Sequence, residues 1–179
     1  TFPVSWAGSI IGLAYDTSRD YVQMAHESEP AATIWNIDYA SHGVVSSWQL
    51  SALNPGWPAT IDNKDGSAYD ATTDTYFLTD YNGDLNVRDD YIVEVDAAGI
   101  VLNAWETDGA DNDSSDGSAI DTVIDIAVIP GSPPRYFVTS IANNLIYEID
   151  LVKTGTWWTA GTWSTISTTA CPGGIGNVV

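Results

Sequence analysis

The chain has 179 residues, is 44% hydrophobic, and carries 5 Lys and Arg against 24 Asp and Glu, which gives a formal net charge of −19. This length and apolar content predict one folded domain with a core and argue against disorder. The charge repels phosphate backbones and anionic lipids, and no apolar run approaches the roughly 20 residues that cross a bilayer, so we expect neither a nucleic-acid partner nor membrane insertion.

The composition also favours strands and an extracellular setting. Eight Trp and nine Tyr accompany abundant Thr, Val and Ile, whereas the residues that build long helices are scarce. Asp clusters with Gly and Asn, which is typical of turns and cation-binding loops; a halophilic or marine surface is the alternative cause. The single Cys171 permits no internal disulfide, and the chain begins at Thr1 without Met or a signal-like apolar segment. We therefore expect a mature secreted or cell-surface product, or an excised segment of one.

Three consecutive units repeat the same order of short strands and turns. The expected strands cover 11–16, 21–24, 33–38 and 43–48 in the first unit; 66–70, 75–78, 91–96 and 99–105 in the second; and 125–129, 135–139, 145–150 and 156–158 in the third. We place the repeats at approximately 8–50, 64–107 and 121–165 of a single domain, 1–179, with 166–179 as a C-terminal tail or linker.

Each unit predicts a four-stranded antiparallel sheet, because its short runs alternate in polarity or are rich in β-branched residues and are separated by turn residues. Repeated sheets of this kind are the blades of a β-propeller. Small residues such as Ala14 and Ala68 suit first strands that crowd a central axis, and Trp48 and Trp105 suit the gaps between blades. The predicted fold class is all-β and β-propeller-like, with three four-stranded antiparallel blades that form half of a six-bladed ring or part of a larger assembly. A meandering β-sandwich is the alternative.

Short motifs recur at matching places in the units. They are Ala14-Tyr15-Asp16, Ala68-Tyr69-Asp70, Val93-Glu94-Val95-Asp96, Tyr147-Glu148-Ile149-Asp150, Gly43-Val44 and Gly99-Ile100-Val101. Together they resemble the blades of secreted six-bladed propellers related to NHL and YWTD repeats, over nearly the whole chain. The resemblance implies the fold far more than the function, because such propellers host binding, scaffolding and hydrolysis alike.

A run of oxygen-bearing side chains separates two expected strands of the second unit. Asp80, Asn82, Asp84 and Asn86 fall at every second position, the spacing by which one loop turns successive oxygens onto a single hard cation. The core resembles the calcium loops of EF-hands and dockerins, but Leu85 stands at the position of Gly and Tyr91 at that of the bidentate Glu. Asp89 or Asp90 would therefore have to complete the coordination of a predicted Ca²⁺. The alternative is a metal-free turn, since Asp, Asn and Gly also form turns on their own.

A second acidic stretch, with Asp111, Asp113 and Asp116, joins the second unit to the third. Its spacing is irregular, so a second calcium site and a solvated loop both remain open. Asn112-Asp113-Ser114 is also a glycosylation sequon, which matters only in a secretory pathway that uses it.

No catalytic set is legible in the sequence. His26 and His42 lie in expected loops, without a Gly-x-Ser-x-Gly elbow or a His-Glu-x-x-His helix. The carboxylates Asp16, Asp70 and Asp125 are expected either to gather at the mouth of a central channel, as in calcium-dependent propeller hydrolases, or to cap the turns that follow their strands. Enzymatic activity is left open, and a role without catalysis is favoured.

We therefore expect an extracellular calcium-binding β-propeller module for binding, adhesion or structural assembly. The alternative is a calcium-dependent propeller hydrolase that acts on a phosphate ester, lactone or glycan. Aromatic side chains such as Trp6, Trp57 and Trp163 suit a glycan or protein ligand.

Closure of the ring sets a further expectation. Propellers typically contain about four to eight blades, so three blades leave two open faces. We expect self-association as a homo-oligomer or filament, or completion by the remainder of a longer chain, with 2–6 and 162–166 as seam strands.

Overall fold

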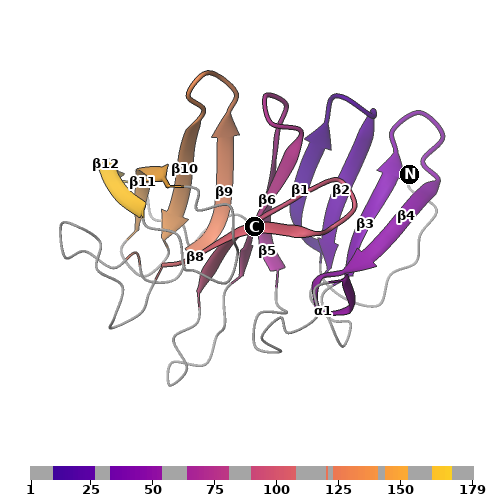
Figure 1. The fold of residues 1–179 in the computed structure, drawn as a ribbon, viewed down its shortest axis with the longest axis horizontal. Coiled ribbons are helices and arrows are strands. Elements are labelled where there is room, and N and C mark those ends of the chain that lie inside the picture. Colours follow the sequence, from indigo (N-terminus) through magenta and orange to yellow (C-terminus); the bar gives the residue numbers. More distant parts are fainter. Residues whose placement is uncertain are drawn as a thin grey trace.

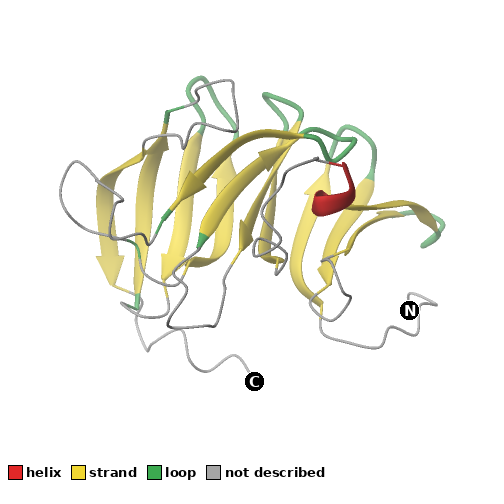
Figure 2. Cartoon of the chain, turned by 60° about the horizontal axis from the view of Figure 1, so that its bottom comes forward, coloured by secondary structure: helices red, strands yellow, loops and turns green. Residues whose placement is uncertain are grey.

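A computed structural model describes residues 10–26, 33–53, 64–80, 90–107, 120, 123–140, 144–152 and 163–170. Within these ranges the chain forms three separate four-stranded antiparallel sheets and one short helix, which confirms the predicted fold class (Figures 1 and 2). No helix in the described ranges is long and apolar enough to cross a membrane.

Each sheet is formed by four strands that are consecutive in the chain and pair in chain order. The first sheet contains β1 (Ile10–Asp16), β2 (Tyr21–His26), β3 (Thr33–Asp38) and β4 (Val44–Gln49), and α1 (Leu50–Leu53) follows it. The middle sheet contains β5 (Lys64–Asp70), β6 (Thr75–Asp80), β7 (Tyr91–Val95) and β8 (Val101–Glu106). The third sheet contains β9 (Val123–Ile129), β10 (Arg135–Ser140), β11 (Leu145–Leu151) and β12 (Trp163–Ala170).

The first hairpin turns of the first two sheets are built by aspartates. Asp16 and Asp70 end β1 and β5, and each accepts a backbone hydrogen bond from the residue two positions later, at 2.8 Å. Asp20 and Asp74 end the turns with φ angles of 58° and 56°, a left-handed conformation that aspartate tolerates. The capping alternative for Asp16 and Asp70 is thus confirmed.

The three sheets stand side by side, with β5–β8 in the middle (Figure 1). Among the first strands, β5 adjoins β1 on one side and β9 on the other, and two glycines make this approach possible. A Cβ atom on Gly12 would lie 2.8 Å from the Asp65 carbonyl oxygen, and one on Gly66 would lie 2.5 Å from the Asp125 Cα atom. The inner strands therefore pack more closely than any side chain at these two positions would allow.

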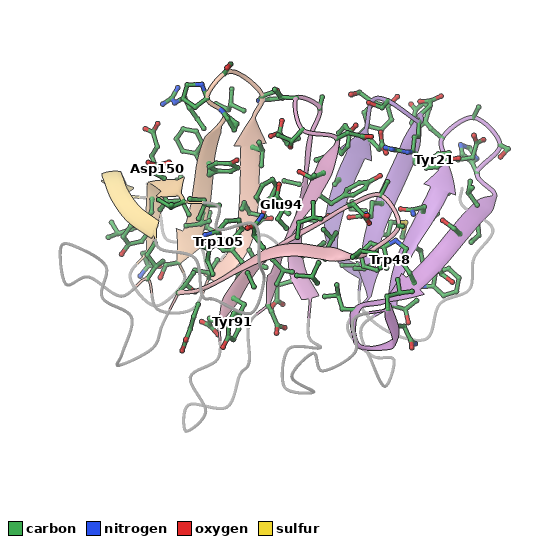
Figure 3. All side chains as sticks on the ribbon, in the orientation of Figure 1. Tyr21, Trp48, Tyr91, Glu94, Trp105 and Asp150 are labelled. Carbon is green, nitrogen blue, oxygen red and sulfur yellow. The ribbon has the colours of Figure 1, made fainter. Side chains whose placement is uncertain are left out.

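The core consists of two clusters, one at each interface between sheets. The first joins residues of β1–β4 and β5–β8 and contains Trp48; the second joins residues of β5–β8 and β9–β12 and contains Trp105. Trp105 stacks on Phe77 with ring centroids 6.3 Å apart, and its Nε1 donates to the Val152 carbonyl oxygen at 3.1 Å (Figure 3). The prediction that Trp48 and Trp105 fill the gaps between blades is confirmed.

The fourth strand of the third sheet differs from the expected one. The expected strand at 156–158 lies outside the described residues, and β12 pairs with β11 instead, from Leu151 opposite Trp163 to Leu145 opposite Ala170. This sheet therefore includes 166–170, part of the segment 166–179 that the sequence predicts to be a C-terminal tail or linker. Both segments combine Trp with Thr, so strand propensity alone did not separate them. Of the proposed seam strands, 2–6 lies outside the described residues, and 163–166 pairs within its own sheet.

Candidate functional site

The predicted calcium loop joins β6 to β7, and the structure describes the residues at its two ends. Asp80 is the last residue of β6 and pairs with Tyr91 across the hairpin, while Asp90 directly precedes β7. Both aspartates are buried, and the Asp90 carbonyl accepts a hydrogen bond from the Thr107 amide at 2.8 Å. Two buried carboxylates at the base of one loop fit the oxygen ligands that Ca²⁺ prefers.

The remaining candidate ligands lie outside the described residues. They are Asn82, Asp84, Asn86, Asp89, Asp111, Asp113 and Asp116. Within the described ranges, no group of three or more His, Cys, Asp and Glu side chains is placed to hold a metal ion. Trp6, Trp57 and Cys171, and the side chains of His26 and Trp163, also fall outside the description. The calcium loop therefore stays a prediction.

The structure does not bring Asp16, Asp70 and Asp125 to one channel mouth. Asp16 and Asp70 end their strands, whereas Asp125 is near the start of β9, opposite Gly66. The third-sheet residue at the register position of Asp16 and Asp70 is Ile129, which pairs with the first residue of β10. The expectation failed for Asp125 because this aspartate precedes the apolar run of its strand, whereas the other two follow theirs.

His42 lies in the turn between β3 and β4, with a φ angle of 59°, and its amide donates to the Asp38 carbonyl oxygen at 2.9 Å. The turn geometry accounts for this residue without a catalytic role.

A buried carboxylate links the first sheet to the middle sheet. Asp16 is buried, and it accepts a short hydrogen bond from the Tyr76 hydroxyl of β6 and one from Arg19 Nη1 at 2.8 Å. Burial acts to raise the pKa of Asp16, but the hydrogen bonds from Tyr76, Arg19 and the turn amides outweigh it and hold the pKa below 3.8. Burial and the bond to Asp16 raise the pKa of Tyr76 well above its usual value of 10.0.

Arg19 extends this contact to the turn of the middle sheet. Its two terminal nitrogens each donate to one oxygen of Asp74 at 2.7 Å, a bidentate arrangement. The Tyr69 hydroxyl lies 2.7 Å from Asp74 Oδ1 and 2.6 Å from Ser18 Oγ. The hydrogen bonds from Arg19, and then from Tyr69, lower the pKa of Asp74 to about 2. The first hairpins of the two sheets are therefore fastened together at their turns.

The interface between the middle and third sheets also brings carboxylates near a tyrosine, while the hydrogen bonds of its buried glutamate lie within the middle sheet. Glu94 of β7 is buried and accepts hydrogen bonds from Thr75 Oγ1 at 3.0 Å and from Asn103 Nδ2 at 2.6 Å (Figure 3). Tyr136 occupies in the third sheet the register position of Tyr76, and Asp70 occupies that of Asp16. Burial, and then the charges of Glu94 and Asp70, raise the pKa of Tyr136.

At the outer faces of the first and third sheets, the register positions of the carboxylate and the tyrosine hold aliphatic residues. Ile129 stands at the aspartate position of the third sheet, and Val22 stands at the tyrosine position of the first sheet. Each internal interface therefore has a carboxylate facing a tyrosine, and each free end has an aliphatic side chain instead. Sequence analysis recognised the Ala-Tyr-Asp motif but not its partner, because the tyrosine comes from the next unit.

We call the face of each sheet that carries Ala14, Ala68 or Ala127 the alanine face. On the middle sheet this face packs against the third sheet, and its residues are buried. They form two cross-strand rows, Ala68–Phe77–Glu94 and Thr79–Ile92.

The alanine face of the third sheet carries the same residue types at the same register positions. Its rows are Ala127–Phe137–Glu148 and Thr139–Ile146. The sequence signal was present in the runs Tyr-Phe-Leu-Thr and Tyr-Phe-Val-Thr, but only the pairing shows that these residues lie on one face. Within the described part of the chain, a neighbouring sheet covers the first of these two surfaces and no sheet covers the second.

The uncovered version is hollowed and apolar. A depression of about 340 Å³ is lined mainly by residues of this face, including Asp125, Ala127, Ile129, Phe137 and Ile146. Ile129 is 49% exposed. At its margin Arg135 Nε donates to Glu148 Oε1 at 2.7 Å, and the guanidinium lies 5.0 Å from the Phe137 ring centroid. The charges at the margin are paired, so the face presents mainly apolar surface.

Similarity to known proteins is found in structure and not in sequence. No protein-family model matches this chain, and no curated protein matches it in sequence. Among solved structures, the chain is similar to one in a crystal structure of a nidogen/laminin complex, with 16% sequence identity, a TM-score of 0.36, and coverage of 92% of this chain and 87% of that chain. The description of the fold therefore rests on the strand order and register given above.

Replacing Tyr76 by Phe tests the buried contact between the first and middle sheets. The variant removes a donor to the buried Asp16 carboxylate, so the free energy of unfolding should fall by about 1–3 kcal/mol, measured by urea denaturation. Tyr39→Phe is the control, because the Tyr39 side chain is exposed. If the free energy of unfolding of Tyr76→Phe equals that of the unaltered chain, this hydrogen bond does not stabilise the interface.

The same contact predicts a loss of stability in acid. The pKa of Asp74 is lowered from 3.8 to about 2 and that of Asp16 is also lowered, so both carboxylates contribute stability that is present above about pH 4. This stability is lost as the pH falls through the folded-state values, towards about pH 2 for Asp74. Asp74→Asn should be less stable at neutral pH and show a shallower decline between about pH 4 and pH 2, followed by circular dichroism. If stability falls with pH equally steeply in Asp74→Asn and in the unaltered chain, the loss of stability in acid does not come from Asp74.

Proposed function

We propose that this protein is an extracellular, calcium-binding β-propeller module that acts by binding and assembly. The observation that carries the proposal is the open alanine face of the third sheet. Its residues Ala127, Phe137, Glu148, Thr139 and Ile146 repeat, at the same register positions, five residues of the surface that the middle sheet buries against its neighbour. A face that only meets water needs no such set of residues.

Energetics favour a covered face. Phe77 is fully buried against the third sheet, whereas Phe137, at the same register position, keeps part of its ring in water. Burying a Phe or Ile side chain contributes roughly 1.5–3 kcal/mol, and contiguous apolar patches mark interaction sites. The open face therefore supports contact with another protein surface, through self-association or a protein ligand. A glycan ligand for the exposed aromatics stays part of the proposal.

Calcium is proposed to stabilise the β6–β7 hairpin. Asp80, Asn82, Asp84 and Asn86 would supply oxygens, with Asp89 or Asp90 completing the set. Clustered carboxylates repel one another until a cation neutralises them, and extracellular modules bind Ca²⁺ with dissociation constants of about 10⁻⁴–10⁻³ M. The buried Asp80 and Asp90 at the base of the loop support this role. A second site at Asp111, Asp113 and Asp116 is proposed on the sequence alone.

A chelator should lower the melting temperature of the purified chain, and added Ca²⁺ should restore it, because the hairpin loses its counter-charge without the cation. Asp84→Ala should be less stable in Ca²⁺ and no longer respond to the chelator. Asp150→Asn is the matched control, since it removes an exposed carboxylate of β11 and should leave the response intact. Equal midpoints with and without chelator, in a protein that contains no calcium, would remove the metal from the proposal.

Phe77 and Phe137 occupy equivalent register positions, so the same substitution at each distinguishes an effect on folding from an effect on association. Phe77→Asp should prevent folding, because it buries a charge between two sheets. Phe137→Asp should leave the circular dichroism spectrum unchanged and cost about 1 kcal/mol or less, but abolish association measured by light scattering. A folded Phe137→Asp protein with the same mass in solution as the unaltered chain would contradict the assembly role of this face.

A further inference from the structure

We infer that the open alanine face of the third sheet is covered by the opposite face of the first sheet of a second copy, so that two chains pack head to tail. The inference rests on the proposed function and specifies the partner and the orientation of that contact. Three properties of the interfaces within the chain support it.

The first property is direction. The first sheet packs its alanine face onto the opposite face of the middle sheet, and the middle sheet packs its alanine face onto the opposite face of the third. Among the described residues, no sheet covers the alanine face of β9–β12 or the opposite face of β1–β4, although Met24 and Ile37 on the latter face are buried. These are the two halves of the interface that the chain already forms twice, and a second copy supplies the missing half to each.

The second property is a matched replacement. At the internal interfaces a carboxylate on the alanine face, Asp16 or Asp70, faces a tyrosine of the next sheet. In a head-to-tail contact the corresponding residues are Ile129 of one copy and Val22 of the other. At this register position an aliphatic pair takes the place of a polar pair, so neither a carboxylate nor a hydroxyl is buried here without its partner.

The third property is exposure. On the opposite face of the first sheet, Leu13 is 61% and Tyr15 is 49% exposed, and both belong to the inner strand β1. Inner strands are the elements that adjoin across the internal interfaces. Met24 and Ile37, farther out on the same face, are buried, so the contact with the second copy is formed mainly by β1.

The geometry and charge of the contact set its strength. Two copies joined head to tail bring six sheets into one ring with two identical contacts, within the usual range for propellers. Asp125 occupies in β9 the register position of Gly12 in β1 and Gly66 in β5, where the absence of a side chain lets inner strands approach closely. The Asp125 side chain therefore keeps the inner strands of two copies farther apart than the inner strands within one chain. Each copy carries a charge of −19, so the contact forms against electrostatic repulsion and should strengthen with salt.

The test uses sedimentation velocity on the full chain at physiological salt with Ca²⁺ present. The unaltered chain should be a dimer, and Phe137→Asp and Leu13→Asp should each be a folded monomer. An equimolar mixture of the two variants should regain a dimer, because the altered faces meet each other and leave one contact intact. Ile100→Asp is the control, since it places the same charge at an exposed apolar residue between β7 and β8 and should remain a dimer.

Each alternative gives a different result. If Phe137→Asp is monomeric and Leu13→Asp stays dimeric, the copies pair third sheet to third sheet, which overturns the head-to-tail inference but not the proposed assembly role. If both variants are monomeric and their mixture is too, the inference is likewise wrong. If the unaltered chain is a monomer at every concentration and salt level, both the inference and the assembly role fall.

Discussion

A sheet with two apolar faces is stable in water only between two neighbours, and the rest of this structure depends on that constraint. The middle sheet meets it on both sides, with Tyr76 and Leu78 in one core cluster and Phe77 and Ile92 in the other. The first and third sheets meet it on one side each. Among the described residues there are two interfaces between sheets and two faces that no sheet covers, and these two faces are the part of the molecule that points to a function.

A polar contact favours the observed neighbour of the first sheet. Burying Asp16 has a desolvation cost, which Arg19 offsets from within the same turn and the Tyr76 hydroxyl offsets only when the middle sheet stands in its place. Glu94 is bound by Thr75 and Asn103 within its own sheet, so its hydrogen bonds stabilise that sheet and do not select a neighbour. Apolar surfaces alone would tolerate other pairings, so the bond between Asp16 and Tyr76 favours one register and one neighbour. Ile129 replaces this aspartate in the third sheet, which gives that end a different selectivity.

Basic residues are scarce, and both arginines of the described part of the chain form ion pairs with carboxylates. Arg19 ties two hairpin turns together through Asp16 and Asp74, and Arg135 pairs with Glu148 at the margin of the open face. With only 5 Lys and Arg against 24 Asp and Glu, most carboxylates must be solvated, capped by backbone amides, or neutralised by a cation. The backbone caps of Asp16 and Asp70 and the proposed calcium loop are two different responses to this excess of negative charge.

The sequence alone determined most strands, the three repeated units and the two tryptophans between sheets, because these features follow from local periodicity and from side chains within one unit. For Asp16 and Asp70 it left turn capping and a channel mouth open, and the hydrogen bonds of the turns decided for capping. It did not determine which segment forms β12, since both candidate segments have similar strand propensity. It also missed the tyrosine that faces each buried aspartate and the equivalence of the Phe77 and Phe137 faces. Those relations join residues of different units or strands, so they arise only when pairing sets the register and packing brings one sheet against the next.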